Sequence, residues 1–143
     1  MINDTAIDYI NRALALARVR HAEILAIKNN KGLEPMYNSI VQQLIYLKNV
    51  VTGQEKDKSK LKELTMGLYA EKEFEASDPV FADRIFSASF IAHQIRKGLK
   101  IKLPHEMESD YYERQKKPRN EHPNNQLFYI NLITCSVTYE FII

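Results

Sequence analysis

Three residues with possible catalytic chemistry, Ser87, Ser89 and His93, lie within two helical turns of one another. A serine becomes a nucleophile when a histidine within hydrogen-bonding distance takes its proton. The spacing from Ser89 to His93 would place both side chains on one face of a helix. In an apolar helix, however, a histidine is more often a hydrogen-bonded core residue than a base. The stretch gives no positive indication of catalysis, and we expect a protein that is not an enzyme.

The sequence predicts no metal or cofactor site. No two histidines stand at metal-ligand spacing on one helix, and the single cysteine, Cys135, has no cysteine partner. The four glycines are isolated, which argues against a glycine-rich phosphate loop. We attribute the basic residues of 96–102 to a helix C-terminus, where cations are favoured, rather than to a nucleic-acid site. The four histidines are His21, His93, His105 and His122.

Acidic residues are concentrated in residues 61–86, which carry six acids against three bases in a chain of formal net charge +2. Three of the glutamates stand near the expected C-terminus of a helix, where the helix dipole disfavours anions by about 0.3–1 kcal/mol each. Such a local conflict is typical of functional sites. A solvated face, paired with Lys72 or with arginines of the first helix, is the alternative. The candidate partner-binding residues are Tyr69, Glu71, Glu73, Glu75, Asp78 and Asp83.

Apolar residues at three-to-four spacing predict four helices that would position these side chains. The first is capped by Asp4 and runs to about Asn30, and the second runs from Pro35 to Gly53. The third begins at Leu61 and leads into the acidic stretch. Short connections favour antiparallel neighbours, so the expected fold is an all-α antiparallel bundle of about four helices.

The fourth helix is expected to be the central one. Asp78 suits its N-cap, Pro79 its first turn and Gly98 its left-handed end. Its apolar residues cover more than half of its circumference, which is typical of a helix buried on several sides. They are Phe81, Ala82, Ile85, Phe86, Ala88, Phe90, Ile91, Ala92 and Ile95.

The C-terminal part follows a different pattern, and we expect a division into a helical unit, 1–104, and an extension, 105–143. Residues 99–103 alternate like a short strand or an extended strap. Residues 105–126 are polar and predict a loop, whereas 133–141 alternate strictly and predict a β-strand. A lone strand must pair, with the strap, with a second copy or with another protein, unless the tail is foreign to the fold.

The composition is that of an ordinary globular domain. The chain has 143 residues, of which 45% are hydrophobic and 27% charged, enough for one domain with a real core. No signal peptide or membrane span is recognisable. With one cysteine there is no internal disulfide, and we expect a cytoplasmic protein.

Four stretches resemble, in this order, the small all-helical immunity proteins that protect bacteria from NAD(P)-glycohydrolase effectors of the type VI secretion system. The similarity covers about residues 3–104 and rests on pattern rather than on a catalytic motif. It is greatest from Gly67 to Asp78 and onward. The stretches are IDYINRALAL (7–16), QQLIYL (42–47), LKELTMGLYAEKEFEASDP (61–79) and GLKIKLP (98–104).

The resemblance implies a binding protein that docks onto a cognate toxin domain and blocks its dinucleotide site. Since a pyrophosphate site is electropositive, an acidic protrusion would be complementary to it. The alternative is a self-associating helical adaptor without a toxin partner, in which the tail would drive a homodimer.

Overall fold

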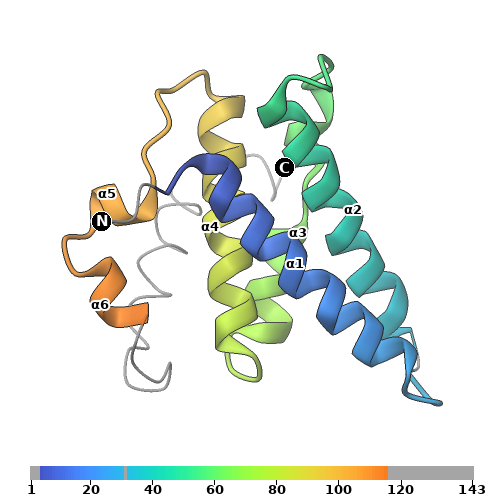
Figure 1. The fold of residues 1–143 in the computed structure, drawn as a ribbon. Helices are drawn as coiled ribbons and strands as arrows, with labels where there is room; N and C mark the ends of the chain where they lie inside the picture. The colour runs from blue at the N-terminus through green and yellow to red at the C-terminus, as the bar shows by residue number, and fades with distance from the viewer. Residues whose placement is uncertain (1–3, 31, 116–143) are drawn as a thin grey trace.

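The computed structural model describes residues 4–30 and 32–115. These residues form helices and contain no β-strand, which confirms the expected all-α class. Figure 1 shows α1 crossing in front of α4, with α2 running back beside α1 as the second arm of a hairpin. The elements are α1 (Ala6–Leu25), α2 (Leu33–Thr52), the 3₁₀ helix η1 (Ser59–Glu63), α3 (Met66–Tyr69), the π-helical turn η2 (Ala70–Phe74), α4 (Pro79–Arg96), α5 (Pro104–Met107) and α6 (Tyr111–Gln115).

Helix α4 lies at the centre of the bundle, as its sequence predicted. It packs against α1, η1, α3 and η2. Phe81, Ala82, Ile85 and Ala88 are fully buried, and Phe86 is 2% exposed. A helix that is apolar over most of its surface is stable in water only when several neighbours cover it.

The ends of α4 follow the local sequence. Asp78 Oδ1 accepts a hydrogen bond from Phe81 N at 3.4 Å, Pro79 occupies the first turn, and Gly98 has a φ of 68°. The expected cap of the first helix was wrong, because Thr5 and not Asp4 is its N-cap. Thr5 and Asp8 exchange the two hydrogen bonds of a capping box.

The predicted third helix is interrupted near Thr65, where η1 has ended and α3 begins. Gln43 of α2 reaches this break: its Oε1 accepts from Thr65 N and Met66 N, both at 2.8 Å, while its Nε2 donates to Thr65 Oγ1 at 3.0 Å. These are the free amides of a new helix start, satisfied here by a side chain from another helix. A contact over more than twenty residues cannot be read from the local sequence.

Replacing Gln43 by alanine should lower the free energy of unfolding by about 1–3 kcal/mol, because two backbone donors lose their acceptor. Urea unfolding, with the slope of the transition checked for constancy, measures this loss. The exposed neighbour Gln42, replaced by alanine, is the control and should change stability by less than about 0.5 kcal/mol. Equal stability of the two variants would show that Gln43 does not hold the break together.

Residues 99–103 form an extended strap and not a strand, and Gln94 fixes it. Gln94 Oε1 accepts from Lys102 N at 2.8 Å, and its Nε2 donates to the Lys102 carbonyl at 2.9 Å. After the strap, residues 105–115 contain most of α5 and all of α6, where the sequence predicted a loop.

The segment after the strap packs against α1. The Tyr9 hydroxyl lies 2.8 Å from His105 Nδ1, and Tyr112 donates to Asp4 at 3.0 Å. Aromatic stacking and the buried ring of Tyr111 hold α5 and α6 in place. Both helices are too short for a hydrophobic periodicity to be detected in their sequences. The strand expected at 133–141 lies outside the described residues, as does most of the expected unit 105–143.

Candidate partner-binding surface

The segment that joins η2 to α4, residues 75–78, which we call the corner, is held to α1 by an ion pair. Arg20 Nε donates to Asp78 Oδ2 at 2.8 Å, and Arg20 Nη1 lies 3.0 Å from Glu23 Oε1. Asp78 therefore caps α4 and also pairs with an arginine of the first helix. For this residue, the structure shows the kind of pairing that the sequence offered as the alternative to a partner contact.

The three predicted glutamates lie on or next to η2. Glu71 and Glu73 are exposed and Glu75 is half-buried, whereas Ala70 and Phe74 of the same turn are buried in the core. The turn thus anchors one side in the bundle and presents carboxylates on the other. Exposed glutamates are required both by the predicted partner contact and by its alternative, a solvated face.

Tyr37 of α2 belongs to the same region, and sequence reasoning missed it. Its ring stacks on Phe81, with centroids 6.1 Å apart and an interplanar angle of 4°, and tilts against Phe74 at 5.3 Å. Burial raises the pKa of Tyr37, and the nearby carboxylates of Asp78, Glu23 and Glu73 raise it further, whereas Arg20 lowers it. The hydroxyl of Tyr37 thus lies in the field of side chains from α1, η2 and the corner.

We call this region the acidic surface; its members come from α1, α2, η2 and the corner. No local sequence signal joins these members, because Arg20 and Glu23 look like an ordinary ion pair between helical residues three positions apart. The ion pair to Asp78, together with the effect of Glu23 on Tyr37, shows that α1 contributes to this region. The acidic surface comprises Arg20, Glu23, Tyr37, Glu73 and Asp78, which the structure brings together, and Glu71 and Glu75, which flank them along the chain.

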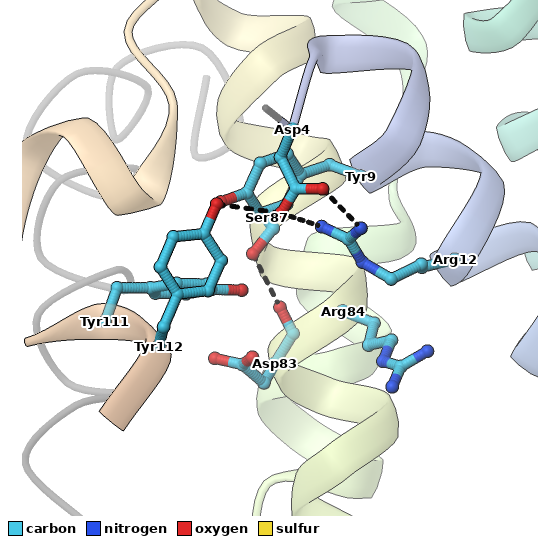
Figure 2. A pocket seen from close by; sticks show the side chains of 8 residues that line it. All are labelled: Asp4, Tyr9, Arg12, Asp83, Arg84, Ser87, Tyr111 and Tyr112. Atoms are coloured by element: carbon cyan, nitrogen blue, oxygen red, sulfur yellow. Dashed lines mark hydrogen bonds and ion pairs between the residues drawn. The ribbon is translucent and has the colours of Figure 1, made fainter. Parts of the chain in front are cut away.

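Tyr69 and Asp83, also predicted for this surface, are placed differently. Tyr69 is half-buried and packs against the core. Asp83 is only 2% exposed and lines a cavity of about 230 Å³ between α1, α4 and α6. Figure 2 shows the Asp83 side chain directed toward Tyr111 and Tyr112, whereas Arg84 points away from them. The structure does not bring Asp83 together with the glutamates.

The cavity beside Asp83 is polar and aromatic. Arg12 pairs with Asp4 at 3.0 Å and lies 4.6 Å above the ring of Tyr9. Burial raises the pKa of Tyr9, so its hydroxyl stays protonated at neutral pH. The other lining residues are Asp83, Arg84, Ser87, Tyr111 and Tyr112.

The serine–histidine stretch does not form the hydrogen bond that nucleophile activation requires. Ser87 Oγ donates to the Asp83 carbonyl at 3.1 Å, while Ser89 Oγ and His93 Nδ1 are buried and make no hydrogen bond. Burial, followed by Lys97 and Arg96, lowers the pKa of His93. His93 is therefore neutral in the core at pH 7.

Within residues 4–30 and 32–115, no group of three or more histidine, cysteine, aspartate or glutamate side chains could hold a metal ion. No helix in that part of the chain is long and apolar enough to cross a membrane.

Comparison with known proteins identifies relatives of this helical body. The Tsi6 family model matches residues 5–94. The curated protein "Immune protein Tsi6" of Pseudomonas aeruginosa strain PAO1 is 36% identical over 100 residues, which are 70% of this chain and 99% of that protein.

Solved structures agree with the sequence relationship. A chain from the structure of Tse6 in complex with Tsi6 is similar with a TM-score of 0.62 and 34% identity, over 71% of this chain and 100% of that chain. The structure of Tsi6 from Pseudomonas aeruginosa gives a TM-score of 0.57 at the same identity, over 71% of this chain and 98% of that chain. Since the family model covers more than half of this chain, and a curated relative matches it over nearly that relative's whole length, the chain belongs to the Tsi6 family.

Proposed function

We propose that this chain is the immunity protein of a secreted effector toxin, and that it binds the toxin domain and occludes its active site. The observation that carries the proposal is the match to an immune protein over almost its whole length. A similar chain also occurs in a solved complex of Tsi6 with Tse6. An immunity protein needs a binding surface rather than catalytic groups, so we propose a non-enzymatic function in the cytoplasm.

The acidic surface is the part of the molecule that we propose for toxin binding. Its carboxylates project from an ordered turn that the bundle anchors, so they are positioned before the partner arrives. The resemblance of the sequence to immunity proteins against NAD(P)-glycohydrolases implies a toxin with a cationic dinucleotide site. Negative charge on one protein and positive charge on the other accelerate association and select the partner. Asp83 is left out of this surface because it is buried.

Co-expression in a bacterial host tests the proposal. The cognate toxin domain should deplete cellular NAD(P) and stop growth when produced alone. Both effects should disappear when this chain is co-expressed, and the two proteins should co-purify as a complex. The control is the chain with Leu44 replaced by aspartate, which should unfold because Leu44 is fully buried.

The proposal would be abandoned if the folded chain neither bound the toxin domain nor protected the cells. Protection without depletion of NAD(P) by the toxin alone would retain the immunity function and change only the chemistry of the toxin.

A further inference from the structure

The turn that carries Glu71 and Glu73 has an unusual backbone. Residues 70–74 form η2, a π-helical turn that directly continues α3. Fewer than about 1% of residues in globular proteins adopt this conformation, in which each hydrogen bond spans five residues instead of four. Its rarity indicates that the α-helix is ordinarily the more stable form. Single π-helical turns within helices occur frequently at functional sites.

The buried residues of this segment indicate that it contains one extra residue. Met66 and Ala70 are fully buried and Phe74 is 2% exposed, so the inward-facing positions are four and again four residues apart. Each residue of an α-helix turns by about 100°, so two steps of four would carry Phe74 about 80° away from the face of Met66. The wider π-helical turn offsets this rotation and keeps Phe74 in the core, where its ring centroid lies 4.9 Å from that of Phe81.

The same spacing indicates that the core does not require the extra residue. The three residues between Ala70 and Phe74 are Glu71, Lys72 and Glu73, and all three are exposed. If one of them were removed, the buried positions would be four and then three residues apart, which is the ordinary pattern of an amphipathic α-helix. The extra residue therefore serves the outer side of the turn, where the carboxylates lie.

The corner that follows the turn has anchors of its own. Asp78 N donates to the Phe74 carbonyl at 2.8 Å, and Arg20 Nε donates to Asp78 Oδ2 at 2.8 Å. Neither contact involves residues 71–73. The link from Phe74 to α1 therefore does not account for the length of the turn.

We propose that the π-helical turn is retained for toxin binding, because its extra residue sets the relative positions of Glu71 and Glu73. This inference rests on the proposed function and adds to it that the toxin domain recognises the spacing of these carboxylates as well as their charge. With Lys72 between them the two glutamates are two positions apart, and without it they would be adjacent. Charge-assisted hydrogen bonds to cations of the toxin depend on such positions, whereas long-range attraction depends mainly on charge.

Deletion of Lys72 from the full chain tests this inference, and Lys72→Ala is the matched control. Both variants lose the same positive charge, but only the deletion shortens the turn to α-helical spacing. The deletion variant should bind the purified toxin domain about 10-fold or more weakly than Lys72→Ala, mainly through faster dissociation, because equal charges give similar association rates. Lys72→Ala should bind at least as tightly as the unaltered chain. In thermal unfolding, the midpoint of the deletion variant should equal or exceed that of the control, because an α-helical turn replaces a π-helical one.

Three results would overturn the inference. A deletion variant that binds as tightly as Lys72→Ala would show that the toxin domain does not recognise the π-helical turn. A deletion variant that unfolds at a lower temperature than the control, or does not fold, would show that core packing requires the extra residue. Equal weakening by Lys72→Ala would assign the effect to the lysine side chain. Failure of the unaltered chain to bind would instead refute the proposed function itself, whatever the stability of the deletion variant.

Discussion

Reversing the charge of Glu71 and Glu73 with lysine should weaken the complex with the toxin domain at least 100-fold, which corresponds to roughly 3 kcal/mol. Both side chains are exposed on η2 and project from an ordered turn. The variant therefore places two cations opposite the proposed cationic site of the toxin. Most of the loss should be in the association rate, because long-range attraction becomes repulsion. Salt should weaken the unaltered complex and should strengthen that of the variant, because ions screen the repulsion.

The stability of the same variant should not fall. Cations are favoured near the C-terminus of a helix, so lysine at these positions suits α3 and η2 at least as well as glutamate. A variant that binds worse and unfolds at an equal or higher temperature is the expected signature of residues kept for binding.

The control for this variant is Glu63→Lys/Glu113→Lys, which changes the net charge by the same amount on η1 and α6. Both of these glutamates are also exposed. It should bind almost normally. If the two variants lost equal affinity, the effect would come from net charge, and the acidic surface would have no special role.

Replacing Phe81 by alanine should destabilise the fold by about 3–5 kcal/mol, a large part of the total stability of a domain of this size. Phe81 is fully buried and packs against Phe74 at 4.9 Å and Tyr37 at 6.1 Å between ring centroids. The three rings come from α4, η2 and α2, so the cavity would open beneath the acidic surface. The midpoint of urea unfolding should shift strongly while the slope of the transition stays constant.

Phe81→Leu is the matched variant, because it keeps most of the apolar volume. It should cost less than about 1.5 kcal/mol and retain toxin binding. A loss below about 1 kcal/mol for Phe81→Ala would mean that the three rings do not form the rigid support of the corner. A large loss for both variants would point to the shape of the ring rather than to its volume.

The local sequence determined the helices whose signals are local. Asp78 and Pro79 mark the start of α4 and Gly98 marks its end, and the apolar residues of α4 identify it as the central helix. The structure confirms each of these points. Exposed glutamates on the turn before α4 were also predictable, because charged side chains between buried Ala70 and Phe74 must face outward.

Other features required contacts between distant residues. The break at Thr65 depends on Gln43 of another helix, and α5 and α6 are ordered by the packing of Tyr9, His105 and Tyr112 against each other. Helices as short as α5 and α6 are not stable on their own, so their sequences carry almost no helical signal.

The candidate surface shows the same division. Sequence alone determined that this protein has a helical body, a buried central helix and a concentration of acids before it, because capping, periodicity and charge are local properties of the chain. Only the tertiary structure decided that Asp83 turns into a cavity, that Arg20 ties Asp78 to α1, and that Tyr37 lies near Asp78, Glu23 and Glu73. The physical reason is that a face shared by several helices is set by how those helices pack, and packing joins residues that have no relation along the chain.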